Sequence, residues 1–224
     1  MAKWAGPDFG GIAREFAAPM AIVVAPQARR RQVVSRNARR LALDSTKVRM
    51  QMIYSAAALV CALIGSKWDI REHRIPNLLT GPAILAGLLL HGLVGGWTQL
   101  GSSALAGLIG GGIFALFYLA GGMGAGDVKL MVAVGCLLGL YPLHLMLLAT
   151  AFTGAAYGLA LAIRQQRLRQ TLANVASIMA HHGREGLTPH PDLNLTNPQS
   201  VRLPFAVPIA AGCCVAAASA LWGR

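Results

Sequence analysis

The sequence predicts an all-α fold: a polytopic helical bundle in a membrane, with about six transmembrane helices. Only 12% of the 224 residues are charged, which is about half the share of an ordinary soluble domain. A further 55% are hydrophobic, and this apolar content excludes a disordered chain. The uncharged stretches also have lengths that suit membrane spans, which need about 20 apolar residues each.

Four stretches without Asp, Glu, Lys or Arg predict the number of helices. They contain 17, 52, 34 and 21 residues and run over 50–66, 75–126, 130–163 and 203–223. The first and the last fit one helix each. The second fits two, with a break at Gly95–Gly96, and the third also fits two, with a break at Tyr141–Pro142 because proline ends or kinks a helix.

The basic residues predict the orientation of these helices. Nine Lys and Arg flank the apolar stretches in the first, third and fifth connections, and none lie in the second and fourth. The positive-inside rule places the basic connections in the cytoplasm and both termini outside. The longest of them, about 164–203, is expected to be a cytoplasmic loop.

Residues 1–49 form a separate, basic N-terminal tail that conflicts with this orientation. The tail carries ten Lys and Arg on the side predicted to be outside, and its best apolar run, 16–25, is too short to span a membrane. Three explanations stay open: a disordered tail, an unrecognised membrane element, or a true translation start at Met50 or Met52. The membrane domain is expected to be 50–224.

The net charge of +12 does not predict nucleic-acid binding. Aromatic residues are few and do not alternate with basic ones as a base-stacking surface requires, so anionic lipid is the expected counter-charge. No C-x-x-C pair occurs, and the six histidines have no metal-ligand spacing, so no metal site is expected. Those histidines are His73, His91, His144, His181, His182 and His190.

Asp127 is a candidate functional residue because buried acids are costly in a membrane bundle. Between residues 75 and 163 the charged residues are Asp127 and Lys129. Such acids are functional candidates by default. Asp127 also follows a glycine-rich stretch that includes Gly124 and Gly126, where glycine permits positive φ or a close approach of another chain. The alternative is a structural role for Asp127 as the N-cap of the next helix.

Asp69 supplies a second carboxylate on the same predicted face of the membrane. Taken alone, it is an interfacial acid that pairs with Arg71 or Arg74. Two carboxylates held together do not both ionise cheaply, so one keeps its proton while the other acts as a base. Asp69 and Asp127 would then activate water against a peptide carbonyl and protonate the leaving amine, without a metal.

The two motifs around these acids closely resemble the signatures of the type IV prepilin peptidases, membrane-embedded aspartyl proteases of the G-x-G-D type. One motif runs from Asp69 through Arg71 and Ile75 to Pro76 and Asn77. The other is the segment 124–130, Gly-Ala-Gly-Asp-Val-Lys-Leu. The segment 203–208 also resembles the proline-bearing start of that family's last helix, and the resemblance covers about 50–222.

The resemblance implies that Asp69 and Asp127 are the catalytic pair, without a cofactor. The supporting motif residues are Gly124, Gly126, Arg71, Pro76, Asn77 and Lys129. It further implies an endopeptidase of the bacterial inner membrane that removes the leader peptide of prepilins at the cytoplasmic face. A six-helix core resembles the small form that serves Flp-type pili. Because no cysteine-rich domain is present, methyltransferase activity is not expected.

Two other classes of function stay open at this stage. A small proton- or cation-coupled transporter would use a buried Asp127 as a relay, but it should tolerate loss of Asp69 better than a protease would. A non-catalytic membrane scaffold of a secretion or pilus machine should tolerate loss of both acids.

Overall fold

The computed structural model describes residues 46–72, 74–186, 188, 191, 193 and 204–222. Its contacts divide the chain into Met1–Lys47 and Val48–Arg224, and the fold below is that of the second unit. The tail predicted for 1–49 lies almost wholly outside the described residues and stays a prediction.

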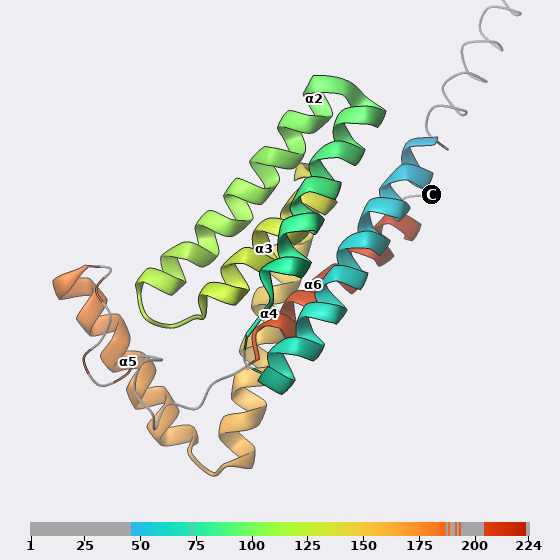
Figure 1. Ribbon diagram of the computed structural model, residues 1–224. Coiled ribbons are helices and arrows are strands. Elements are labelled where there is room, and N and C mark those ends of the chain that lie inside the picture. The colour runs from blue at the N-terminus through green and yellow to red at the C-terminus, as the bar shows by residue number, and fades with distance from the viewer. Residues whose placement is uncertain are drawn as a thin grey trace, which may run out of the picture. The chain divides into compact units, whose positions relative to one another are not determined.

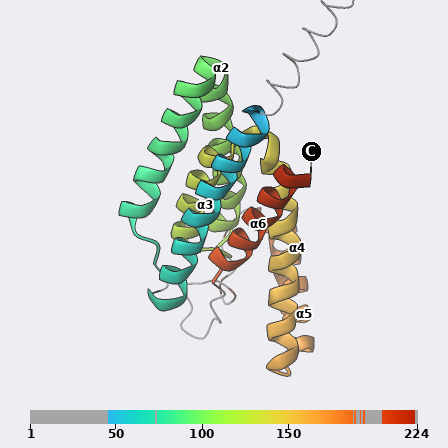
Figure 2. The same cartoon turned by 90° about the vertical axis from the view of Figure 1, so that its right-hand side faces the viewer.

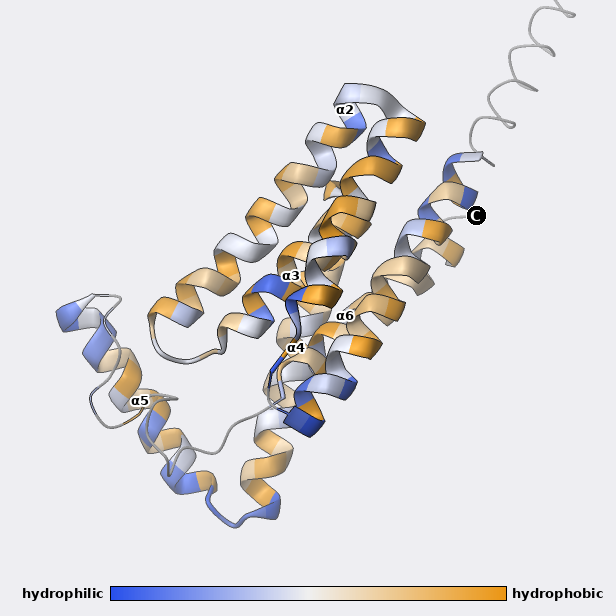
Figure 3. Ribbon diagram, viewed as in Figure 1, coloured by the Kyte–Doolittle hydropathy of each residue, from blue (hydrophilic) through white to orange (hydrophobic). Residues whose placement is uncertain are grey.

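Every regular element of the described residues is an α-helix, which confirms the all-α prediction (Figure 1). The helices are Thr46–Glu72, α2 (Asn77–Leu119), α3 (Ala125–Leu138), α4 (Leu140–Arg164), α5 (Leu168–Glu185) and α6 (Ala206–Trp222). Among the described residues, three are long and apolar enough to cross a membrane: Thr46–Glu72, α2 and α4. Hydrophilic residues gather at the C-terminal end of Thr46–Glu72 and at the turn after α4 (Figure 3).

Helix α2 is a hairpin of two helical arms. Its 43 residues would extend about 65 Å if straight, roughly twice the thickness of a membrane core. At Gly96 the backbone leaves the helical region, with φ 64° and ψ −158°. The two arms lie side by side and run in opposite directions (Figures 1 and 2). The break predicted at Gly95–Gly96 is therefore confirmed.

The break predicted at Tyr141–Pro142 is wrong by a few residues. Helix α3 ends at Leu138, and the turn lies at Gly139, where φ is 75°. Pro142 instead belongs to the first turn of α4. Proline is tolerated there because the first turn of a helix makes no use of its backbone N–H groups.

Close backbone contacts hold α3 against both arms of α2. A Cβ atom on Gly87, in the first arm, would lie 2.6 Å from the carbonyl carbon of Cys136. In the second arm, a Cβ on Gly107 would overlap the Sγ of Cys136, and a Cβ on Gly135 of α3 would lie 2.7 Å from the Ala106 oxygen. Only residues without a side chain permit this approach. Leu130 and Met131 of α3 are completely buried: Leu130 packs beside Gly65 of the Thr46–Glu72 helix, and Met131 packs beside Gly110 of the second arm.

Side chains satisfy the last carbonyl groups of α3 inside the bundle. The Ser103 hydroxyl donates to the Cys136 oxygen at 2.6 Å, and the His91 Nε2 donates to the Leu137 oxygen at 3.2 Å. The Tyr54 ring stacks on His91 with 4.0 Å between ring centroids. A buried helix end needs such partners because its final carbonyls have none within the helix. His91 therefore has a structural role here.

The connection predicted as a loop over 164–203 is in part helical. Helix α5 occupies Leu168–Glu185, so His181 and His182, expected in an irregular segment, lie on a helix. The apolar residues of this segment recur at the spacing of a helix, which the prediction of a loop left out. Most of 187–203 lies outside the described residues.

Replacing Gly87 with Ala should lower the stability of the bundle. The added methyl group meets main-chain atoms of α3, which cannot rotate away, and overpacking of this kind costs about 1–3 kcal/mol. Thermal unfolding in detergent should show a lower midpoint for Gly87→Ala. Gly81→Ala is the matched control, since nothing lies within 4 Å of its added Cβ. Equal midpoints for both variants would contradict the packing described for α3.

Candidate active site

A cavity of about 280 Å³ lies where the Thr46–Glu72 helix ends and α3 begins, at the same end of the bundle (Figures 1 and 2). Both predicted acids line it. Its lining residues are Asp69, Arg74, Ile75, Gly124, Ala125, Gly126, Asp127 and Lys129. The two sequence motifs, whose acids lie 58 residues apart in the chain, therefore meet at one cavity.

Asp69 contacts the start of α6. Its side chain is buried, and its Oδ2 accepts a long hydrogen bond of 3.4 Å from the Ala206 N–H. The Ser66 hydroxyl donates to the Ala206 oxygen at 2.7 Å and so ties the same residue to the Thr46–Glu72 helix. A backbone N–H at a helix N-terminus favours a negative charge on its acceptor. The contact therefore favours the carboxylate form of Asp69.

Asp127 lies in the first turn of α3 but is not its N-cap. That position belongs to Gly124, whose oxygen accepts from the Asp127 N–H at 3.2 Å, so the predicted capping role is wrong. The Asp127 side chain is 8% exposed, and its Oδ1 has no hydrogen-bond partner among the described residues. A buried carboxyl oxygen without a donor disfavours the ionised form of the group.

The pKa of Asp127 is raised to about 7: burial is the main cause, the charge of Asp69 adds to the rise, and a backbone hydrogen bond with Gly124 opposes it. Asp127 precedes the uncharged stretch that starts at Leu130, and it lies outside the three helices long enough to cross a membrane. The two acids of the cavity thus have unlike surroundings. Near neutral pH, a pKa of about 7 lets Asp127 hold a proton.

Neither Gly124 nor Gly126 needs a positive φ, and each has room for about one methyl group. Gly124 has φ −81°, and neither glycine is among those with positive φ, which include Gly121 in the preceding turn. A Cβ on Gly124 would lie 3.4 Å from the Asp127 Oδ2, and a Cβ on Gly126 would lie 3.4 Å from Ile75. Both glycines therefore keep the cavity wall thin beside the carboxyl group.

A hydrogen bond joins the two motifs at the rim of the cavity. The Lys129 Nζ donates to the Asn77 Oδ1 at 2.9 Å. Asn77 opens α2 directly after its N-cap, Pro76, whose fixed φ and missing N–H suit the start of a helix. Arg71 is exposed and is not among the residues lining the cavity, so the structure does not bring this motif residue to the acids.

Three contributors to the site were absent from the candidates chosen from the sequence. Arg74 lines the cavity, and Ile75 packs against Gly126. Ala206 contributes only a backbone N–H, which no motif displays. Arg74 could have been chosen from the sequence, because it lies within the first motif, three residues after Arg71. Within the described residues, no group of three or more His, Cys, Asp or Glu is placed to hold a metal ion.

Residues 56–159, which include both acids, match the sequence model of the type IV leader peptidase family. Over this part, somewhat less than half of its length, the chain is similar to that family. Similar proteins include the "Prepilin leader peptidase/N-methyltransferase" of Aeromonas salmonicida (strain A449) and that of Aeromonas hydrophila. Each is 34% identical over 100 residues, which cover 42% of this chain and 34% of the relative. The chain thus aligns with about a third of the length of these relatives, and no solved structure matches it.

The carboxyl group of Asp127 should titrate near pH 7 in the folded protein. Infrared difference spectra of wild-type protein should show its protonated C=O band at pH 6 and lose it by about pH 8. Asp69→Asn should move the midpoint to lower pH, because the neighbouring charge that raises the pKa is removed. Asp127→Asn must lack the band altogether. A wild-type midpoint near the usual value of an aspartic acid would contradict the unlike surroundings described here.

Proposed function

We propose that the chain is a membrane-embedded aspartyl endopeptidase that removes the leader peptide from prepilins. The observation that carries the proposal is the meeting of Asp69 and Asp127 at one cavity, within the part of the chain that matches the leader peptidase family. The names of the similar Aeromonas proteins support the substrate class.

In the proposed mechanism the two acids have different roles. Ionised Asp69 takes a proton from a water molecule while the oxygen of that water attacks the scissile carbonyl carbon. Protonated Asp127 donates its proton as the C–N bond breaks, so that the amine leaves neutral. The tetrahedral intermediate collapses to a carboxylic acid and a free amine, which leaves the water-derived proton on Asp69 and Asp127 ionised. Proton transfer through solvent then restores the resting pair. Burial of Asp127 supports this division, because it keeps a proton available near neutral pH.

Arg74 and Lys129 have an electrostatic role in this proposal. Both line the cavity, and the lysine makes its hydrogen bond to the neutral amide of Asn77 and keeps its full charge. A cation close to the scissile carbonyl stabilises the negative oxygen that forms in the transition state.

We place the protein in the bacterial inner membrane with six crossings and the cavity facing the cytoplasm. The crossings are Thr46–Glu72, the two arms of α2, the uncharged part of α3 with its turn, α4 and α6. The nine basic residues of the odd connections support this orientation. The proposed substrate is a Flp-type prepilin, because the six-helix core resembles the small form of the peptidase that serves Flp-type pili. We limit the proposed activity to cleavage of the peptide bond.

Asp69→Asn and Asp127→Asn should each reduce cleavage of a Flp-type prepilin in membranes by more than about 100-fold. The loss is expected because the one aspartate that remains in each variant does not act as both base and acid. The assay compares precursor and shortened product at matched levels of enzyme. Glu72→Gln is the matched control, because Glu72 is an exposed acid three residues from Asp69 and does not line the cavity. Residual cleavage of more than a few per cent in either Asn variant would exclude the paired mechanism. Loss of cleavage in the Asp127 variant alone would show that Asp69 does not take part in the reaction.

Replacing Gly126 with Val should abolish most cleavage, whereas Gly126→Ala should retain it. The alanine methyl reaches ordinary contact distance from Ile75, but the γ-carbons of valine extend further and force Ile75 or α3 to move beside Asp127. Gly112→Val reports on the general cost of valine in a helix, since nothing lies within 4 Å of its added Cβ. Equal cleavage by the two Gly126 variants would show that the close approach of Ile75 is not required.

A further inference from the structure

Helix α5 presents an apolar stripe that no part of the described protein covers. Leu168, Leu172, Val175 and Met179 recur at intervals of four, three and four residues, so they lie on one face of the helix. Their exposed fractions are 36%, 60%, 49% and 71%. No residue of α5 is buried, and its contacts with other labelled helices are with α4.

A hydrogen-bonded turn at 165–167 ends α4 and changes the direction of the chain before α5. Gln166 adopts a left-handed φ of 55°. The Gln166 N–H donates to the Ile163 oxygen and the Arg167 N–H donates to the Ala162 oxygen, both at 3.0 Å. This pair of bonds is the Schellman motif, which closes a helix and satisfies its last carbonyls. Because only 165–167 separate the two helices, α5 starts at the level where the apolar α4 ends.

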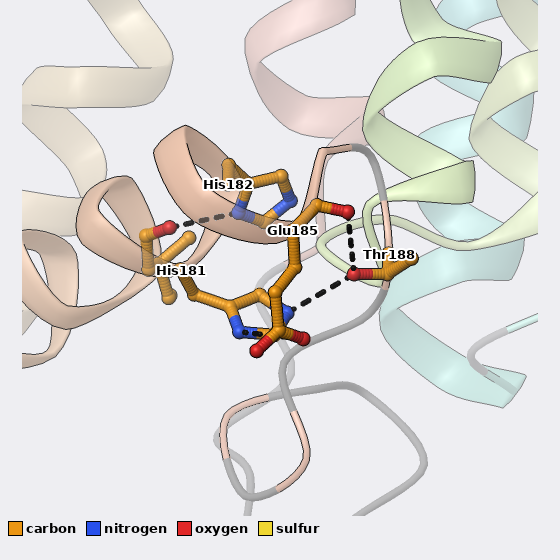
Figure 4. A network of polar contacts seen from close by, with 5 residues as sticks. His181, His182, Glu185 and Thr188 are labelled. Carbon is orange, nitrogen blue, oxygen red and sulfur yellow. Dashed lines mark hydrogen bonds and ion pairs between the residues drawn. The ribbon is translucent and has the colours of Figure 1, made fainter.

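The C-terminal end of α5 is closed by contacts of its own polar residues (Figure 4). The Glu185 carboxylate lies 3.7 Å from the His181 Nδ1, and the Thr188 hydroxyl lies 3.2 Å from the His181 Nε2. The His182 Nδ1 donates to the Ile178 oxygen at 2.8 Å. These contacts involve none of the four stripe residues, so the stripe is left for another partner.

The charges around the stripe complement an anionic surface. Between Arg164 and Glu185 the chain carries four arginines and one acidic residue, and that acid is the one beside His181. Arg164, Arg167, Arg169 and Arg184 are all exposed. A helix with an apolar stripe and a basic polar face binds in the plane of a membrane interface, about 5–10 Å into the headgroup boundary. Long arginine side chains reach the headgroups from there.

We propose that α5 lies in the interface of the membrane leaflet that contains the C-terminal end of α4, with its apolar stripe in the acyl chains and its arginines on anionic headgroups. The occupant of the stripe is therefore lipid. Continuity with a helix able to cross the membrane and the excess of positive charge both favour lipid over a second protein.

The depth of the stripe in a bilayer tests the proposal on the full chain. Single nitroxide labels at Leu172 and Met179 are compared with labels at Gln170 and Ser177, which lie on the other side of α5, in a background where Cys61, Cys136, Cys213 and Cys214 are replaced. In nanodiscs of phosphatidylcholine with one third phosphatidylglycerol, the stripe labels should collide more with oxygen than with a water-soluble nickel chelate. The other two labels should show the reverse.

Two results would overturn the proposal. Stripe labels that collide freely with the nickel chelate would place α5 in water. Stripe labels shielded from both quenchers would show that protein, such as a second copy, covers the stripe. Because the readout needs no cleavage, it is independent of the proposed peptidase activity.

Hydrogen exchange of the unmodified protein tests the role of lipid charge and does not depend on the cysteine-free background. The amides of α5 should exchange about tenfold or more slowly in the anionic nanodiscs than in pure phosphatidylcholine, because each arginine near an anionic surface adds to binding. The amides of α3, packed inside the bundle, are the internal control. Equal exchange of α5 in both lipids would exclude the anionic headgroups as its partner.

Discussion

The close approach of α3 to both arms of α2 is the constraint on which the rest of the structure depends. Gly87 and Gly107, from opposite arms, both contact Cys136, and the distances leave no room for a side chain at either position. Backbone-to-backbone contact of this kind restricts the position of α3 more tightly than contact between side chains, because side chains can change rotamer and main-chain atoms cannot. The first turn of α3, with Asp127, is consequently fixed relative to α2.

Because α3 is short, fixing its C-terminal end also fixes the position of its N-terminal end. Fourteen residues span about 21 Å, so the helix stops inside the bundle and its last carbonyls need partners. Ser103 and His91 supply them from the second and first arms of α2. The same helix thus carries a polar anchor at one end and the candidate active-site acid at the other. This arrangement places the acid on a rigid element, as precise chemistry requires.

The two acids of the cavity gain their difference from the elements around them. Asp69 meets a backbone N–H at the start of α6, 137 residues further along the chain, whereas Asp127 has an oxygen without a donor. The first environment favours charge and the second disfavours it. In the proposed mechanism, this asymmetry would separate a base from an acid without any difference in side-chain type.

The sequence by itself determined the all-α class, the break at Gly96 and the pair Asp69 and Asp127, because these follow from local composition and short motifs. Transfer of a stretch into a membrane depends on its own residues, and an uncharged stretch of 52 residues is too long for one span, so it must turn, which glycine permits. The spacing of the apolar residues in α5 also predicts a helix, although the low average hydropathy of the segment is typical of a loop.

Only the tertiary structure decided where α3 ends, why Gly126 is small and what Asp69 contacts. The turn lies at Gly139 and not at Pro142, because a proline in the first turn of a helix breaks nothing. Gly126 faces Ile75, from a segment about 50 residues earlier, and Asp69 meets the backbone of Ala206. Contacts between distant segments depend on how the helices pack, and neither composition nor local spacing contains that information.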